Sequence, residues 1–417
     1  MLKQVFFQQY YDFRNIVSAE TFLLSCRIFS SSLEDDRFDM AILELQRVNE
    51  INDFETEWNQ LLAQSLDNNP FLTHEWLTSW WKQYGKRRTL KLFTANSREG
   101  VTSLIAPIMY STYTRFGLKL RKAEFVASPD SEYNAFLVTN FQEATKAVNP
   151  LIKSIMEDLS DTDSLVLGEV PEDSYTAKLL ENVNIDLVGT NRSVINSCPY
   201  IAFPNNHETY LQTLGPNMRR SLKRCERQAL KDYKVGFVRY DKIGTVKEAM
   251  RIFFELHLKR QTQAGEHGLF SESVNRSFHL DVANAFAKKG WLALFFLTFN
   301  DEPVSSIYGY EYNKKLYAYL SGFDPDYAMY RPGHLAIKNL LRYGVEKELK
   351  EFDFLRGNEE YKTIWGSSKI RRNLEYRISK RSFRAKLYNL TAKNRTLPYL
   401  YGASALPNRF LTWAHAR

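Results

Sequence analysis

The tripeptide Arg331-Pro332-Gly333 stands at the start of a segment with helical periodicity, and its residue types suit the binding of a phosphate group. A helix that begins here presents free backbone N–H groups at the positive end of its dipole. Arg331 adds a fixed charge, Pro332 presets the backbone φ angle, and Gly333 lets a ligand approach the main chain. Because a Pro-Gly pair before a helix is also an ordinary turn, the interpretation as a pyrophosphate site depends on the surrounding elements.

The segments around this turn predict three strands, a loop, a helix and a final strand. The expected ranges are strands at 291–299, 304–312 and 315–321, a helix at 334–347 that opens with His334, and a strand at 351–355. Asn313-Lys314 has the spacing of a two-residue hairpin. The turn therefore lies between a strand and a helix, where backbone amides are available to an anion.

Upstream, alternating helical and strand-like patterns predict a separate α/β unit that ends near residue 200. Helices are expected over 53–66 and 144–159, and Thr73 is expected to cap a helix that carries Trp76, Trp80 and Trp81. We interpret this tryptophan cluster as core, with carbohydrate stacking as the alternative. The predicted organisation is a poorly structured extension at 1–39, domains at 40–200 and 201–378, and a basic tail at 379–417.

The composition is that of a globular protein of about two domains. The chain has 417 residues, of which 44% are hydrophobic and 25% charged. Residues 369–417 hold 12 Lys or Arg and one acid, a net +11 (12 − 1), so residues 1–368 carry about −3 (8 − 11). Three widely spaced cysteines indicate neither a disulfide framework nor a zinc site. The longest apolar run, 291–299, is too short to span a bilayer. We therefore expect a cytoplasmic protein without a metal.

Five short motifs along the chain together point to one protein family. They are Asn69–Trp76, Leu256–Arg260, Tyr319–Pro325, Arg331–Gly333 and Phe352–Lys362. This set resembles the CelD-type branch of the GNAT acyltransferases, which is related to the Fem-type transferases of peptidoglycan synthesis. The resemblance covers about residues 41–378. Members usually have Ser before the Pro-Gly pair, so Arg331 is a departure that either adds a phosphate contact or is neutral.

The resemblance implies an α+β fold of two tandem GNAT-like domains with mixed central sheets. It also implies that the second domain holds acyl-CoA, most simply acetyl-CoA, as co-substrate. Arg331, Gly333 and His334 are the residues expected to bind it.

The implied reaction moves an acyl group from the thioester to an amine, which requires a base, a stabilised oxyanion and an acid. Asp353 and Glu359 are the carboxylates that the motif places best, with Tyr319 or Tyr361 as the acid. These four are the predicted catalytic residues.

The same motif supplies candidates for binding the acceptor. Lys362 resembles a lysine with which Fem-type relatives hold a phosphorylated acceptor. Arg356 and Trp365 complete the predicted substrate-binding set.

Each of these residues also has a purely structural interpretation. Asp353 alternates with apolar neighbours and could pair with Arg356 at a strand end. Glu359 and Lys362, three residues apart, could form a solvated ion pair of little value. Tyr319 lies in a strand, where a tyrosine commonly serves packing.

Two basic segments leave alternatives open. The helix expected at 217–232 could contact nucleic acid, grip a phosphorylated or lipid-linked glycan, or form a solvated face. The basic tail could contact an anionic membrane peripherally or be a solvated extension.

The function expected from the sequence is an N-acyltransferase that acts on an amine of a sugar or nucleotide-sugar for envelope polysaccharide. The acceptor is then a small molecule or glycan. One rival is a Fem-like transferase that uses aminoacyl-tRNA, although the nearly neutral body argues against a large nucleic-acid footprint. The other rival is a catalytically degenerate scaffold at a polysaccharide synthase.

Overall fold

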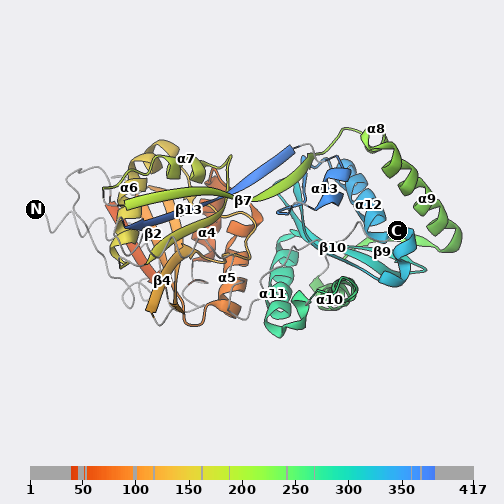
Figure 1. Cartoon of the computed structure of the whole chain (residues 1–417), viewed down its shortest axis with the longest axis horizontal. Coiled ribbons are helices and arrows are strands. Elements are labelled where there is room, and N and C mark those ends of the chain that lie inside the picture. Colours follow the sequence, from red (N-terminus) through yellow and green to blue (C-terminus); the bar gives the residue numbers. More distant parts are fainter. Residues whose placement is uncertain are drawn as a thin grey trace, which may run out of the picture. The chain divides into compact units, whose positions relative to one another are not determined.

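The chain folds into two units that share two strands. The computed structural model describes residues 39–45, 51, 54–96, 101–115, 118–160, 163–186, 188–240, 243–266, 268–357, 359–366 and 369–380 (Figure 1). One unit contains the chain up to Ile195 together with the segment from Arg372, and the other is Asn196–Arg371. Most of the predicted extension at 1–39 and of the tail at 379–417 lies outside the described residues. The domain boundaries expected from the sequence stay a prediction.

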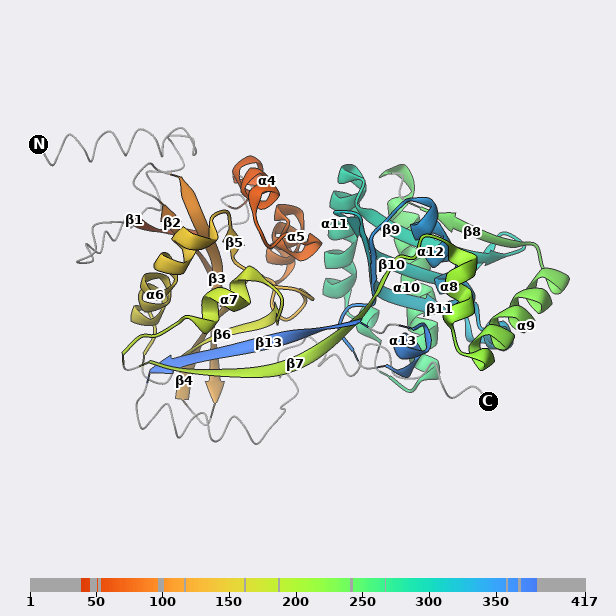
Figure 2. The same ribbon diagram turned by 90° about the horizontal axis from the view of Figure 1, so that it is seen from above.

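The first unit alternates helices and strands. Its elements are β1 (Asp39–Leu45), α4 (Glu55–Gln64), α5 (His74–Tyr84), β2 (Thr89–Asn96), β3 (Thr102–Arg115), β4 (Leu118–Phe125), β5 (Leu137–Val138), α6 (Phe141–Glu157), β6 (Ser164–Pro171) and α7 (Tyr175–Glu181). Its sheet has the order β1-β2-β3-β4-β6-β13, where β13 (Lys369–Lys380) arrives from the end of the described chain (Figure 2). The β4–β6 pair is parallel, and the other pairs with printed register are antiparallel.

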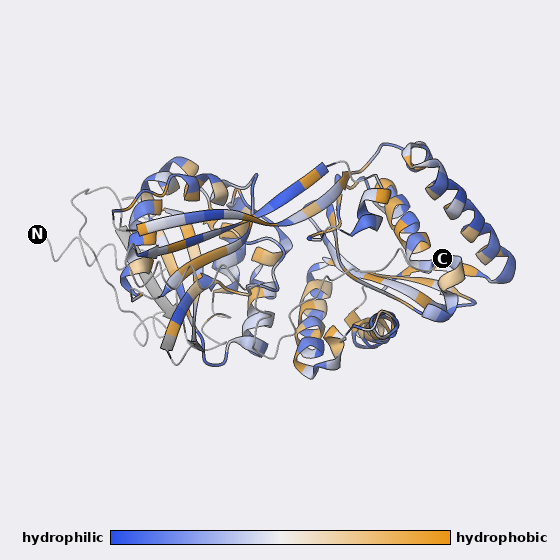
Figure 3. Cartoon of the chain, viewed as in Figure 1, coloured by the Kyte–Doolittle hydropathy of each residue, from blue (hydrophilic) through white to orange (hydrophobic). Residues whose placement is uncertain are grey.

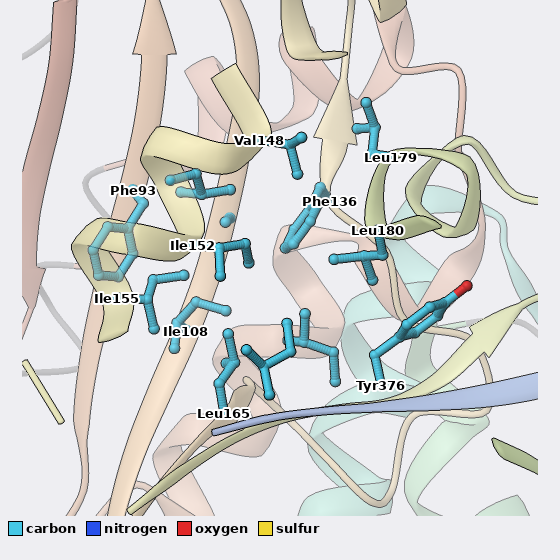
Figure 4. Packing of buried hydrophobic residues seen from close by; sticks show 14 of the residues in the cluster. Phe93, Ile108, Phe136, Val148, Ile152, Ile155, Leu165, Leu179, Leu180 and Tyr376 are labelled. Atoms are coloured by element: carbon cyan, nitrogen blue, oxygen red, sulfur yellow. The ribbon is translucent and has the colours of Figure 1, made fainter. Parts of the chain in front are cut away.

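Helix α6 covers one face of this sheet because its apolar residues recur every three or four positions. Val148, Ile152 and Ile155 are fully buried and pack toward strand residues such as Ile108 and Leu165 (Figure 4). The Asn140 side chain caps the helix by accepting a hydrogen bond from the Glu143 amide. This packing gives the first unit its own hydrophobic core.

The second unit contains the candidate site. Its elements are the end of β7 (Val188–Ala202), α8 (His207–Thr213), α9 (Pro216–Asp232), β8 (Val235–Arg239), α10 (Val246–Gln263), α11 (Ser273–Lys289), β9 (Leu292–Phe299), β10 (Glu302–Tyr312), β11 (Lys315–Phe323), the 3₁₀ helix η4 (Pro325–Tyr330), α12 (Pro332–Glu346), β12 (Glu351–Asp353) and α13 (Glu360–Ile364). The strand order is β7-β12-β11-β10-β9-β8. The β11–β12 pair is parallel and the others are antiparallel.

Strand β12 is short because the chain turns immediately after it. The Asp353 carboxylate accepts a hydrogen bond from the Leu355 amide at 2.8 Å, and Leu355 adopts a left-handed φ of 58°. Register between β11 and β12 therefore covers only Lys315–Tyr317, although β11 continues to Phe323. Beyond Asp353 the described chain pairs only with β7, since the Phe354 amide donates to the Pro199 carbonyl at 3.1 Å and the Gly357 amide to the Ser197 carbonyl at 2.9 Å.

Helix α10 packs closely on the part of β11 that β12 does not reach. A side chain at Gly322 would place its Cβ 2.4 Å from the His257 backbone nitrogen and 2.6 Å from the Leu256 carbonyl carbon. The Lys259 ammonium also pairs with Asp324 at 2.5 Å. Glycine at position 322 thus lets the helix backbone approach the strand.

The predicted α+β fold with mixed sheets is confirmed, and several local predictions agree with the structure. Thr73 caps α5, and Asn313 and Lys314 adopt the positive φ angles of a tight hairpin turn. The loop expected after residue 321 is instead the end of β11 followed by η4. The Asp324 side chain starts this 3₁₀ helix by accepting from the Asp326 amide. Among the described residues no helix is long and apolar enough to cross a membrane.

We predict that Gly322→Ala lowers the free energy of unfolding by about 2–3 kcal/mol, because backbone atoms rather than flexible side chains occupy the space. Urea unfolding followed by circular dichroism measures the change. Gly215→Ala is the matched control, since nothing lies within 4 Å of a Cβ there. Equal stability of the two variants would contradict the close packing of α10 on β11.

Candidate active site

A pocket lies beside the part of β11 that extends past the end of β12. It is lined by Ser305, Ile307, Ala318, Leu320, Ser321, Gly333, Ile337, Phe352, Phe354 and Tyr361. These residues come from β10, β11, α12, β12 and the segment that follows β12. The pocket is narrow, with a cavity volume of about 20 Å³, and it is partly open to solvent. Its walls are mostly apolar, which suits the flexible arm of a cofactor or an acyl chain.

The start of α12 opens onto this pocket through one backbone amide. The Arg331 amide donates to the Ala328 carbonyl, and the amides of His334 and Leu335 both donate to the Arg331 carbonyl. Pro332 has no N–H. Within the described part of the chain nothing accepts a hydrogen bond from the Gly333 amide, and Gly333 lines the pocket. The positive end of the helix is therefore available to a ligand at Gly333.

Arg331 holds a strained backbone at this turn. It adopts a left-handed conformation with φ 50° and ψ 55°, which is uncommon for a residue with a side chain. The exposed guanidinium contacts the Ser221 hydroxyl of α9 at 3.0 Å. The contact keeps a positive charge beside the turn, where the sequence predicts a phosphate.

His334 contributes a neutral ring. Burial and then the Arg331 charge lower its pKa to about 4, and its ring centroid lies 6.0 Å from that of Trp365. At neutral pH the imidazole is therefore uncharged. A role in cofactor binding, which stays a prediction, would rest on shape and hydrogen bonding instead of charge.

Tyr361 is the predicted acid that lies in the pocket wall. Its ring is buried and lies 6.0 Å from that of Phe354. Burial, and secondarily the charge of Glu359, raises the pKa of its phenol well above the usual value. The hydroxyl therefore stays protonated at neutral pH, which is the state that a proton donor needs.

Lys362 and Glu359 form a buried ion pair. The structural interpretation from the sequence was an ion pair exposed to solvent. The Lys362 ammonium is fully buried and lies 2.9 Å from Glu359 Oε2. It also donates to the carbonyls of Leu355 (3.2 Å) and Arg356 (2.8 Å). These contacts fold the segment between β12 and α13 around one cation. Binding of an acceptor by Lys362 stays a prediction.

Gly357 makes this fold possible. Its φ is 127°, and a Cβ there would lie 2.3 Å from a Glu359 carboxylate oxygen. Only glycine adopts this backbone conformation without strain. The Glu359 carboxylate can therefore occupy this buried position only because residue 357 has no side chain.

Asp353 is fully buried, and its structural partner differs from the one considered from the sequence. One oxygen accepts from the Leu355 amide, and the other lies 3.0 Å from the Arg371 guanidinium. Arg371 in turn lies 4.7 Å from the centroid of the Tyr200 ring. The partner is thus Arg371 and not Arg356. A catalytic role for Asp353 stays a prediction.

Tyr319 is placed away from the pocket lining. It is buried, with ring centroids of His279, Tyr308 and Tyr310 at 5.4, 6.1 and 5.6 Å. This aromatic environment agrees with the structural interpretation, in which Tyr319 serves packing. Its role as an acid stays a prediction.

The two remaining substrate-binding candidates lie in the same segment. Arg356 is half-buried, and its carbonyl accepts from Lys362. Trp365 is fully buried, and its carbonyl accepts a hydrogen bond from the Tyr210 hydroxyl. Its indole Nε1 has no hydrogen-bond partner in the part of the chain that the structure describes.

Sequence reasoning missed a set of polar groups at the open end of β11. His257 Nδ1 donates to the Ser321 carbonyl at 2.8 Å, and Arg260 Nη1 reaches the same oxygen at 3.4 Å. Arg260 is only 3% exposed, so burial lowers the pKa of its guanidinium, while Tyr361 and nearby carboxylates raise it. Both residues belong to the motif at 256–260. The sequence assigned no functional role to either residue.

The corresponding place in the first unit is filled by the chain itself. Strands β4 and β6 pair only over Lys122–Glu124. Beyond that, Asn134 donates its amide to the Glu169 carbonyl at 2.8 Å and its side-chain nitrogen to the Gly168 carbonyl at 3.1 Å. The loop after β4 thus lies along the free part of β6.

The tryptophan cluster helps to hold that loop. Trp76 Nε1 donates to the Ser131 hydroxyl at 2.9 Å, and Trp80 Nε1 donates to Asp130 at 2.7 Å. Trp76, Trp80 and Trp81 are all buried. They are core residues, and their packing between the two halves stays a prediction.

No group of His, Cys, Asp and Glu able to hold a metal occurs among the described residues. Residues 216–363 match the sequence model of the acetyltransferase (GNAT) domain. This segment contains the pocket, the Arg331-Pro332-Gly333 turn and the Glu359–Lys362 pair. It is an acetyltransferase domain of the GNAT type, and the prediction of an N-acyltransferase is confirmed at the level of enzyme class.

About four fifths of the chain is similar in fold to the solved structure of FemX. FemX has 13% sequence identity and a TM-score of 0.56, with 81% of this chain and 98% of that chain covered. A conserved protein of unknown function from Bacteroides thetaiotaomicron has 11% identity, a TM-score of 0.49, and coverage of 78% and 97%. L-PGS from Bacillus licheniformis has 10% identity, a TM-score of 0.47, and coverage of 81% and 95%. No curated protein sequence matches the chain.

We predict that His334 makes the protein less stable in acid. The pKa of this ring is depressed from 6.5 to about 4 in the folded state, so its contribution is complete above pH 6.5 and is lost as the pH falls toward 4. Over that interval the wild type should lose about 3 kcal/mol more unfolding free energy than a His334→Gln variant. Urea titrations at a series of pH values measure this difference. Parallel curves would contradict a neutral, buried His334.

We predict that Lys362→Met lowers the unfolding free energy by about 3–5 kcal/mol, because it leaves the Glu359 carboxylate buried without its cation. Denaturant unfolding measures the loss. The double variant Lys362→Met, Glu359→Gln is the control and should recover much of it. If Lys362→Met is as stable as the wild type and only raises the KM of the acceptor, the lysine serves the substrate and not the loop.

Proposed function

We propose that this protein transfers an acyl group, most simply acetyl, from acyl-CoA to an amine on a sugar or nucleotide-sugar used for envelope polysaccharide. One observation supports the donor above all. Gly333, whose amide is the second of α12, lines a largely apolar pocket inside the segment that matches the acetyltransferase domain. An amide at a helix N-terminus suits the diphosphate of CoA, and the apolar pocket suits its pantetheine arm.

In the proposed reaction the acceptor amine attacks the thioester carbonyl, and the carbon–sulfur bond then breaks. The nitrogen loses a proton to a base, and the CoA thiolate gains one from an acid. Tyr361 is the proposed acid, because its phenol lies in the pocket wall and burial keeps it protonated. Glu359 is the proposed base, acting through water, because its charge lies close enough to raise the pKa of Tyr361.

The buried cations near Tyr361 fit the same reaction. Arg260 contacts the Ser321 carbonyl in the pocket wall and feels the charges of Tyr361 and Glu359. A positive charge in a dry site stabilises the developing oxyanion or thiolate more than it would in water. Lys362 serves mainly to hold the segment that carries Glu359 and Tyr361.

The acceptor class rests on the resemblance of the motifs to the CelD-type branch. A cytoplasmic location and a peripheral contact of the basic tail with anionic membrane belong to the same proposal. Purified protein, acetyl-CoA and a panel of free and nucleotide-linked amino sugars, analysed by mass spectrometry, test it directly. An acetylated amino sugar supports the proposal, whereas acetylation of none of the panel members overturns this acceptor class.

The two rival functions are separated by thermal shift, because a ligand that binds the native state raises Tm. A shift with acetyl-CoA and CoA but not with tRNA supports the proposed function. A shift with tRNA alone favours a Fem-like transferase, and no shift with either favours a scaffold.

We predict that Gly333→Val weakens binding of CoA by at least about 30-fold, because the valine methyl groups would occupy the ligand's approach to the amide. Isothermal titration calorimetry measures the affinity, and a thermal melt within a few degrees of the wild type shows that the fold persists. Gly244→Val is the control, since a Cβ there meets nothing within 4 Å. Unchanged CoA affinity in Gly333→Val would show that the diphosphate binds elsewhere.

A further inference from the structure

Helix α9 has two faces of opposite character. Met218, Leu222, Cys225 and Ala229 form a stripe that is buried against the second unit. The Cys225 thiol contacts the Met329 carbonyl of η4 at 3.9 Å, and the Glu226 carboxylate pairs with Lys338 of α12 at 2.6 Å. The apolar stripe of α9 therefore packs against the second unit, and its opposite face is the outer face of the helix (Figures 1 and 3).

The outer face is an array of cations. Arg219, Arg220, Lys223, Arg224, Arg227 and Lys231 are all exposed. Within the described residues none of the six forms an ion pair. Positions 220, 224, 227 and 231 follow helical spacing and so align along the axis over about 16 Å. The array is continuous and one-sided.

The acids of α9 do not neutralise this array. Glu226 is turned toward Lys338, and Asp232 accepts hydrogen bonds from Gln228 (2.6 Å) and from the Tyr330 hydroxyl (2.9 Å). Both acids are thus held at the flanks. The outer face keeps six exposed positive charges, of which Arg220 also donates to the Asn217 side chain.

A large apolar side chain stands among these cations. Leu230 is 61% exposed on α9, and Met329 on the adjoining η4 is 70% exposed. Neither residue has a role in packing that would explain its type. No aromatic side chain lies on the outer face of α9, so stacking on unpaired bases, on which proteins that bind single-stranded RNA rely, is not available there.

We propose that this basic face, defined by the six cations and Leu230, docks on a membrane surface rich in anionic phospholipid. Clusters of four to eight Lys and Arg on a helix are attracted to such surfaces, and an apolar side chain that enters the interface strengthens the contact. Because the apolar stripe of α9 is occupied by the protein core, the contact is electrostatic and reversible. Docking would place the Arg331 turn, which contacts Ser221 of α9, beside the membrane.

Flotation of the full-length protein with vesicles tests the proposal. The wild type should bind phosphatidylglycerol-containing vesicles, bind pure phosphatidylcholine vesicles poorly, and dissociate as salt rises. In Arg220→Gln, Arg224→Gln, Arg227→Gln the partition coefficient should fall on the order of 100-fold, at roughly fivefold for each charge. Glutamine keeps helix propensity, and circular dichroism confirms that the variant is folded.

A matched control removes the same charge elsewhere. Lys86, Lys153 and Lys288 are exposed on other parts of the fold, and their triple replacement by Gln should leave binding nearly unchanged. Leu230→Gln, which alters no charge, should weaken vesicle binding several-fold but should not affect binding of an RNA.

Three results would overturn the proposal. Vesicle binding that the α9 variant retains would assign the contact to another basic segment. Equal loss of vesicle binding in the Lys86/Lys153/Lys288 control would show that binding depends on the net charge of the protein and not on α9. Binding of tRNA in gel shift by the wild type, abolished in the α9 variant, together with no binding to anionic vesicles, would assign the face to nucleic acid.

Discussion

The hydrogen bond from the Leu355 amide to the Asp353 carboxylate ends β12 after three residues, and the architecture of the site depends on it. Because β11 continues for six residues beyond its last pairing with β12, this part of β11 has no strand partner on the β12 side among the described residues. The ion pair from Arg371 to Asp353 fixes the place where this happens. Gly333 and Tyr361 both line the pocket beside this part of β11.

Buried charge around the pocket is stabilised by backbone carbonyls and partner charges. Lys362 gathers two carbonyls and Glu359, and Arg260 reaches the Ser321 carbonyl that His257 also contacts. Such groups are costly to bury and tolerate little displacement. The arrangement therefore holds Tyr361 in one position and protonated, as the proposed proton transfer requires. The first unit has a comparable parallel pair, but its loop after β4 fills the corresponding place.

Much of the fold could be predicted from local patterns, whereas the site could be predicted only in part. The hairpin at Asn313-Lys314 and the Thr73 cap follow from turn and capping chemistry, which depends on neighbours in sequence. The motif at 352–362 indicated the right segment but did not distinguish Tyr361 in the pocket wall from Tyr319 in an aromatic cluster. That difference depends on which face of the sheet α10, α11 and α12 cover. The partner of Asp353 was missed for the same reason, since Arg371 is eighteen residues away.

The sequence by itself determined the order of the elements, the α+β class and the turn before α12. These properties follow from side-chain period, backbone preference and charge, all of which act within a few residues. Only the tertiary structure decided that a pocket lies beside the free part of β11, that the Glu359–Lys362 pair is buried, and that Arg260 meets Ser321. Contacts of this kind join segments tens of residues apart, and the burial that gives each charge its energy exists only after those segments have packed together.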